Sequence, residues 1–179
     1  MEPGSDPPAQ VERHFADFYE GAKPFQMDRI PEGGMCLSVF LVLWHVDRRR
    51  VLLGKVNPDH DWVRAGALSR ESAEKASGRW MLPSSHLLLY ESAEDAAERV
   101  LREQLGLGWN DLKSREFHVF SEAYGKPKHW DTEFVFQGEI VQAPKGPAWR
   151  GLKFVDVSAL PDAEFARNHQ DILAELSLR

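Results

Sequence analysis

Acidic and basic side chains recur at helical spacing in the segment 91–106. Glu91 opens the segment, Arg99 follows eight residues later, and Glu103 lies four residues beyond Arg99. Oxygen ligands on one face of a helix can bind a hard divalent cation such as Mg²⁺, which could activate water for hydrolysis. The alternative is that Glu103 is a surface glutamate paired with Arg99, because opposite charges four residues apart are ordinary support for a helix.

A helix over residues 92–105 would position these groups. Ser92 is a good N-cap, and Asp95 three residues later can complete a capping box. Gly106 is well placed to end the helix in a left-handed conformation. The sequence therefore predicts the two ends of this helix as well as its existence.

The stretch that precedes the helix, LPSSHLLLYES at 82–92, is unusually apolar for a loop. We expect an irregular loop over residues 82–91. The leucines at 87–89 cannot all face inward from one short loop. At least one of them should therefore contact a partner chain or the long polar segment 57–79.

The segment 85–107 resembles the Nudix box, whose pattern is G-x5-E-x7-R-E-U-x-E-E-x-G-U, with U a bulky apolar residue. The residues that carry the resemblance are in register without a gap: Leu82-Pro83, His86, Glu91, Ser92, Ala96-Ala97, Arg99, Leu101, Glu103, Gly106 and Leu107. The order of expected strands and helices is similar over roughly residues 35–175. The resemblance implies a Nudix fold and hydrolysis of nucleoside diphosphate derivatives, with Mg²⁺ or Mn²⁺ bound by glutamates of the helix.

The chain departs from this pattern where the metal would bind. Val100 stands where the box has a glutamate directly after the arginine, and Gln104 stands where it has another. Ser85 replaces the loop glycine, so a tight turn loses its most permissive residue. Because affinity for a hard cation follows the number of charged oxygen ligands, Mg²⁺ or Mn²⁺ should bind weakly or not at all.

The resemblance implies roles for several residues of the box. It assigns Glu103, Glu91 and Arg99 to the catalytic group, with Glu91 mainly bracing the loop and Arg99. It makes Glu103 and Gln104 the metal candidates, although Gln104 suits a hydrogen-bonding role in the cleft better than a ligand role. Two further cleft candidates are Ser85 and His86, and the default for this histidine is a hydrogen-bonded loop residue.

A second group of polar side chains lies outside the box, in the stretch KHWDTEF. His129, Asp131 and Glu133 alternate along an expected strand and should share one face. That face could overlook the cleft and supply oxygen ligands or a general base. The alternative is the polar outer face of an edge strand. Trp62 and Trp80, in or beside the polar segment 57–79, could flank a planar ligand.

The remaining patterns predict a mixed α/β (α+β) fold with helices packed on a mixed sheet. We expect residues 1–30 to be an extension with a short helix at 11–19, and residues 31–179 to form the Nudix-like domain. The expected elements are a buried strand at 35–44, a second strand at 51–56, a helical turn at 70–76, two strands in 114–141, a strand in 151–160 and a terminal helix from 162 onward.

Composition excludes several classes of function. The formal net charge of −6 disfavours nucleic acid and anionic membranes as partners, because both require a cationic surface. The apolar run at 35–44 is too short to span a bilayer. Cys36 is the single cysteine, which indicates a reducing compartment and a cytoplasmic protein.

Three hypotheses of function remain. The favoured one is a Nudix-fold protein whose hydrolysis is weak or lost and whose cleft binds a nucleotide or another phosphorylated small molecule. The second is an active Mg²⁺- or Mn²⁺-dependent hydrolase that uses carboxylates from outside the box. The third is a homodimer formed through exposed leucines at 87–89, with no chemistry in the cleft.

Overall fold

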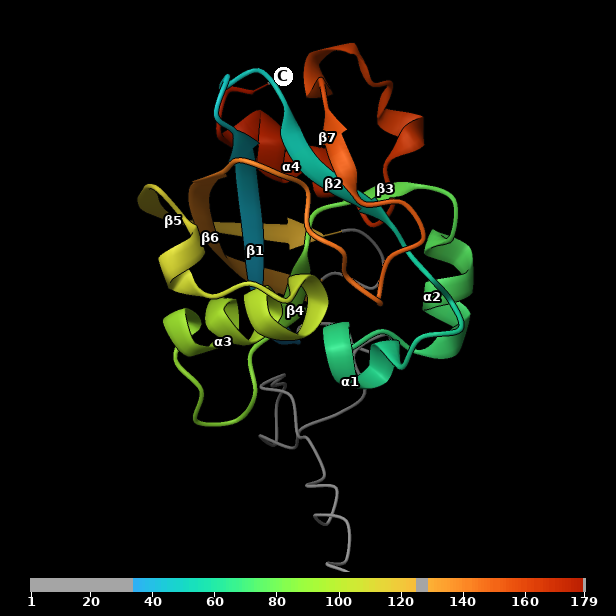
Figure 1. Cartoon of the computed structure of the whole chain (residues 1–179). Coiled ribbons are helices and arrows are strands. Elements are labelled where there is room, and N and C mark those ends of the chain that lie inside the picture. The colour runs from blue at the N-terminus through green and yellow to red at the C-terminus, as the bar shows by residue number, and fades with distance from the viewer. Residues whose placement is uncertain (1–33, 125–128, 179) are drawn as a thin grey trace, which may run out of the picture.

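The computed structural model describes residues 34–124 and 129–178 (Figure 1). The expected helix at 11–19 and residues 125–128, between the two strands expected in 114–141, lie outside the described residues. Among the described residues, every helix is too short or too polar to cross a lipid bilayer.

A seven-stranded mixed sheet organises the domain. Its main path runs β3-β2-β1-β6-β5, while β4 pairs with β1 and β7 pairs with β2. The β1–β6 pair is parallel and the other pairs are antiparallel. The bounds are β1 Met35–His45, β2 Val51–Lys55, β3 Trp80–Met81, β4 Ser84–His86, β5 Arg115–Tyr124, β6 His129–Ile140 and β7 Lys153–Val155. The predicted mixed fold class is confirmed.

Strand β1 is the centre of the sheet because its apolar run can be buried on both faces. Alternate residues point to opposite faces of a strand. Val39, Leu41 and Leu43 belong to one buried cluster, and Phe40, Val42 and Trp44 belong to the other. The predicted buried strand is therefore confirmed.

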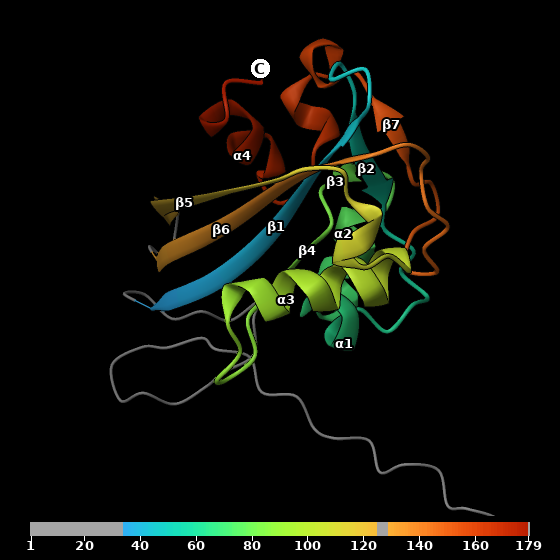
Figure 2. The same ribbon diagram turned by 60° about the vertical axis from the view of Figure 1, so that its left-hand side comes forward.

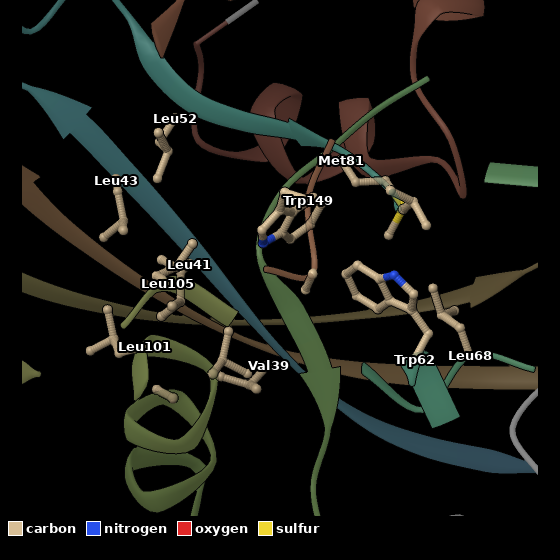
Figure 3. Close-up of a cluster of buried hydrophobic side chains, with 14 of the residues drawn as sticks. Val39, Leu41, Leu43, Leu52, Trp62, Leu68, Met81, Leu101, Leu105 and Trp149 are labelled. Atoms are coloured by element: carbon tan, nitrogen blue, oxygen red, sulfur yellow. The ribbon is translucent and has the colours of Figure 1, made fainter. Parts of the chain in front are cut away.

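A helix covers each face of this sheet, as Figure 2 shows. Helix α3 (Ala93–Val100) continues as a π-helix over Leu101–Leu105, and both segments bury their apolar side chains in the cluster of Val39 and Leu41. Figure 3 shows Leu101 and Leu105 meeting side chains of β1 on this face. Helix α4 (His169–Glu175) places Ile172 and Leu173 in the other cluster.

Both ends of the predicted central helix are confirmed. The Ser92 Oγ accepts a hydrogen bond from the Asp95 backbone N–H at 3.1 Å, which caps the first turn. Gly106 has φ +67° and accordingly ends the helical segment. The helical length is as predicted, but its last turn is a π-helix and not an α-helix.

The polar segment 57–79 holds two short helices. Helix α2 (Arg70–Ala76) is the predicted helical turn. Helix α1 (Trp62–Gly66) is an addition that the sequence patterns did not reveal, and Asp61 caps it by accepting from the Arg64 N–H. Trp62 and Leu68 from this segment enter the same core cluster as Val39 (Figure 3).

The prediction of an irregular loop over 82–91 is wrong at its start. Ser84–His86 form strand β4, which pairs antiparallel with β1 through the register Ser38↔His86 and Phe40↔Ser84. A short polar stretch can become a strand when it lies beside the unpaired backbone groups of a central strand. The strand ends at His86, Leu88 is a single bridge residue, and Leu89 and Tyr90 form a turn.

The leucines at 87–89 are not exposed together, and one of them packs with side chains of the segment 57–79, as predicted. Leu87 is buried in the cluster that contains Trp62 and Leu68, and Leu88 and Leu89 are half-buried. The exposed residue of the loop is instead Tyr90, which has φ +67°. Leu87 therefore joins the core together with Trp62 and Leu68 of the segment 57–79, and a homodimer through the leucines stays a prediction.

The predicted terminal helix from 162 onward is too long. Residues 162–164 form a 3₁₀ turn, and the chain is not helical again until α4 begins at His169. The reason is a tertiary contact, because the Ala166 N–H donates to the Trp80 carbonyl oxygen beside β3. Arg167 and Asn168 then adopt left-handed conformations that turn the chain into α4.

Candidate functional site

A cleft of about 230 Å³ lies beside strands β1, β4 and β6 and the start of α4. Six elements and the turn before α4 contribute to it, so it joins segments from much of the domain. Its lining residues are Ser38, Phe40, Trp62, Gly66, Leu68, Met81, Ser84, Ser85, His86, His129, Asp131, Glu133, Arg167, Asn168, His169 and Ile172. We refer to this space as the cleft.

The polar side chains expected on one face of β6 line this cleft together. His129, Asp131 and Glu133 are all lining residues, and only 2% of Glu133 is exposed. Asp131 accepts a hydrogen bond from the Ser38 Oγ at 2.7 Å, across the parallel β1–β6 pair. The predicted common face is therefore present, while the chemical roles of the three residues stay predictions.

His169 is a cleft residue that sequence reasoning missed. It is 3% exposed, and its Nδ1 accepts a hydrogen bond from the Leu82 backbone N–H at 3.0 Å. Burial, assisted by the nearby positive charge of Arg167, lowers the pKa of His169 to about 3, so the ring is neutral near pH 7. A signal was available, since His169 is a lone histidine near the start of the predicted terminal helix.

One of the two tryptophans expected to flank a ligand does line the cleft. Trp62 is fixed there by donating from Nε1 to the Asn57 carbonyl oxygen at 2.9 Å, and its ring meets Trp149 edge-on at 5.0 Å. Figure 3 shows these two rings side by side. Trp80 lies elsewhere, with the Lys55 and Lys153 ammonium groups over its ring.

Glu91 and Arg99 form a buried ion pair beneath the loop. The Arg99 Nε and one terminal nitrogen donate to the two Glu91 carboxylate oxygens, both at 2.8 Å. Glu91 also accepts from the Leu88 backbone N–H at 2.8 Å. These bonds join α3 to the loop and account for the spacing of the two residues without any bound ligand.

Ser85 and His86 connect this ion pair to the cleft. Arg99 donates to the Ser85 Oγ at 3.2 Å and to the His86 carbonyl oxygen at 2.8 Å, while both residues line the cleft. Arg99 therefore holds β4, which forms one wall of the cleft, although Arg99 itself does not line the cleft.

Val100, Glu103 and Gln104 of the box do not line the cleft. Val100 is completely buried in the core of the α3 face. The Gln104 Nε2 donates to the carbonyl oxygens of Ala65 and Ser84, both at 2.7 Å. Glu103 is partly exposed, with its carboxylate 3.9 Å from the Arg102 guanidinium, and it does not line the cleft.

This donor set does not fit the metal clamp implied by the box. In the described ranges 34–124 and 129–178, no group of three or more His, Cys, Asp or Glu side chains is arranged to hold a metal ion. Asp131 and Glu133 of β6 line the cleft, whereas Glu103 does not.

Solved structures identify the architecture. No family model and no curated protein matches the sequence. A MutT Nudix hydrolase from Burkholderia pseudomallei matches with 17% identity, 79% of this chain covered, 98% of that chain covered and a TM-score of 0.55. The Nudix domain of Shewanella oneidensis NrtR, complexed with ADP-ribose, matches with 19% identity, coverages of 80% and 86% and a TM-score of 0.55.

A third structure belongs to a named enzyme of the same architecture. The dihydroneopterin triphosphate pyrophosphohydrolase of E. coli matches with 16% identity, coverages of 77% and 92% and a TM-score of 0.52. At identities this low, the structural matches show a shared arrangement of strands and helices and do not show a shared activity. With its central parallel strand pair, its loop-helix segment at 82–106 and its helices on both faces of the sheet, the chain has the Nudix fold.

Proposed function

We propose that this Nudix-fold protein binds a nucleotide-like ligand in the cleft and that its metal-dependent hydrolysis is weak or lost. The ligand would be a small phosphorylated molecule. The box residues Glu103, Glu91 and Arg99 would then contribute through structure and not through a metal-bound water.

The observation that carries this proposal is the bonding of Gln104. Its amide nitrogen donates to two backbone carbonyl oxygens, one from α1 and one from β4. A carboxylate has no proton to donate near pH 7, so it would face two oxygens at the same place. Glutamine at position 104 therefore links α1 to β4 through two hydrogen bonds that a glutamate there could not donate.

The cleft supports the binding half of the proposal. It combines the aromatic walls of Phe40 and Trp62 with polar groups at Ser38, Asp131 and His169. Ligand sites are typically concave and largely apolar, with a few convergent polar groups that set orientation. A nucleotide offers the matching parts, namely a planar ring with hydrogen-bonding edges and a phosphorylated tail.

The test measures binding and turnover separately. We expect GDP or ADP-ribose to raise the melting temperature of the wild type without added metal. We also expect little Mg²⁺- or Mn²⁺-dependent product release from nucleoside diphosphate derivatives. Brisk hydrolysis that is lost in Glu103→Ala would contradict the proposed loss of activity, and the absence of any nucleotide-dependent shift would contradict the binding role.

Restored carboxylates provide the complementary measurement. Val100→Glu and Gln104→Glu would each place a charge in the buried layer, so both should lower the melting temperature in the absence of metal. If the double variant assembles a clamp with Glu103, Mn²⁺ should recover more stability in it than the two single variants predict together. Glu98→Gln, on the exposed side of α3, is the control and should not respond to Mn²⁺.

An active hydrolase remains a second candidate because the cleft holds its own carboxylates. Asp131 and Glu133 could bind a divalent ion or act as a general base, independently of the box. This candidate predicts Mn²⁺-dependent turnover that survives Glu103→Ala and is lost in Asp131→Asn.

A further inference from the structure

His169 is a buried polar residue that lines the cleft. It is the first residue of α4, and 3% of it is exposed. Its ring meets Phe40 edge-on, with centroids 5.1 Å apart and planes at 80°. This contact and the bond from Leu82 to Nδ1 fix the orientation of the ring from two sides.

The bond to Nδ1 also fixes where the proton of the ring resides. A ring nitrogen that accepts a hydrogen bond carries no proton, so a neutral imidazole must carry its proton on Nε2. Because burial and Arg167 keep the pKa of His169 near 3, the ring stays neutral throughout the ordinary pH range. The other ionisable groups that line the cleft are His86, His129, Asp131, Glu133 and Arg167.

The proton on Nε2 has no acceptor within the protein, as far as residues 34–124 and 129–178 are concerned. Among the described residues, four side-chain atoms are sealed from solvent and have no hydrogen-bond partner: Gln104 Oε1, Trp109 Nε1, Trp149 Nε1 and Gln170 Oε1. His169 Nε2 is not one of these sealed atoms. A molecule in the cleft can therefore reach it. A buried donor normally finds a partner, so this one is suited to an acceptor supplied by a ligand.

Asp131 supplies the opposite kind of group to the same cleft. One of its carboxylate oxygens, Oδ1, accepts from Ser38, which leaves Oδ2 for a ligand N–H. The cavity, at about 230 Å³, is smaller than the 300–1,000 Å³ typical of sites for whole drug-sized ligands. It suits a single ring system, with any phosphates outside, away from the negative charges of Asp131 and Glu133.

We propose that His169 is a specificity-determining hydrogen-bond donor, whose Nε2–H donates to a carbonyl oxygen of the ligand ring while Asp131 accepts from an adjacent ring N–H. The ligand class is a ring with a lactam edge, of which guanine is the nucleotide example. This inference rests on the proposed function, since it requires that the cleft bind a nucleotide-like ligand.

The tautomer can be measured without any ligand. In ¹⁵N-labelled full-length protein, long-range ¹H–¹⁵N spectra should show one histidine locked as the neutral Nε2–H tautomer from pH 5 to pH 8. Its signals should be missing from His169→Gln and present in the control His118→Gln, whose histidine lies on β5 outside the cleft. A ring that titrates near pH 6.5, or that carries its proton on Nδ1, would overturn the proposal whatever the protein binds.

Binding is then measured by titration calorimetry with two probes. GDP carries the lactam edge, whereas 2-aminopurine riboside 5′-diphosphate lacks the six-position oxygen. The variant His169→Phe keeps an aromatic ring beside Phe40 and removes the donor. We expect it to bind GDP roughly tenfold more weakly than the wild type does, with a much smaller change for the second probe.

The outcomes separate the two proposals. Equal loss for both probes in His169→Phe would assign His169 a purely structural role and overturn the inference, as would unchanged GDP affinity. Wild-type protein that binds neither GDP nor ADP-ribose would overturn the proposed function, and the ligand role of His169 would fall with it. His169→Gln, which retains an N–H donor, should bind GDP more tightly than His169→Phe does.

Discussion

At the scale of single residues, Arg99 shows how a box position can be retained for a structural reason. Arg99 is 4% exposed, and its guanidinium donates to Glu91, Ser85 and the His86 carbonyl oxygen. Removing one partner of a buried ion pair leaves an uncompensated charge, which costs far more than the pair contributes. Glu91 and Arg99 therefore depend on each other whether or not the protein hydrolyses anything.

The substitution Glu91→Gln tests this dependence. It keeps the shape of the side chain but removes the charge opposite Arg99, so we expect a loss of about 3 kcal/mol in the free energy of unfolding. Urea denaturation would measure it. The matched control is Glu71→Gln, which breaks the exposed pair with Lys75 on α2 and should change stability by about 1 kcal/mol or less. Similar losses in the two variants would show that the buried pair is not a structural brace.

At the scale of elements, α3 is held at its start by a cap that the sequence predicted. The Ser92 Oγ accepts from the Asp95 N–H and donates to the Asp95 carboxylate at 2.7 Å. Ser92→Ala should destabilise the protein by about 1 kcal/mol, whereas Ser92→Asn retains a capping oxygen and should stay close to the wild type. Thermal unfolding of both variants checks this, and an alanine variant as stable as the asparagine one would contradict it.

The elements that could be predicted are those whose sequence pattern is local. The apolar run of β1 predicts a buried central strand, and the capped segment at 92–105 predicts the helix beside it. Alternation in β6 predicts that His129, Asp131 and Glu133 share a face. In each case the spacing of apolar and polar residues along the sequence matches the repeat of the strand or helix that forms.

The elements that could not be predicted depend on distant partners. Strand β4 exists because Ser84–His86 lie beside β1, and nothing in its own composition favours a strand. Helix α4 starts late because Ala166 bonds to Trp80, far away in the sequence. His169 enters the cleft only through this delayed start, which is why the pattern of the terminal helix did not identify it.

At the scale of the whole molecule, the cleft depends on the complete fold. Ser38 and Asp131 come from two strands that are parallel neighbours. Trp62 comes from a segment between these strands in the sequence, and His169 from a segment after both. The cleft side chain with the clearest link to global stability is His169, since its protonation differs between the folded and unfolded chain. This link can be measured.

The pKa of His169 is about 3 in the folded protein and about 6.5 once unfolding exposes the ring. Between these values the unfolded chain binds a proton that the folded chain does not, so stability falls as the pH drops below 6.5. From pH 7 to pH 5 this single group should remove about 2 kcal/mol from the free energy of unfolding. His169→Gln lacks the titrating ring, so its stability should decline less steeply than that of the wild type over this range. Urea denaturation of both proteins at several pH values measures the difference, and His118→Gln, on β5, is the matched control. Parallel pH profiles for the wild type and His169→Gln would mean that His169 is not held neutral by the fold.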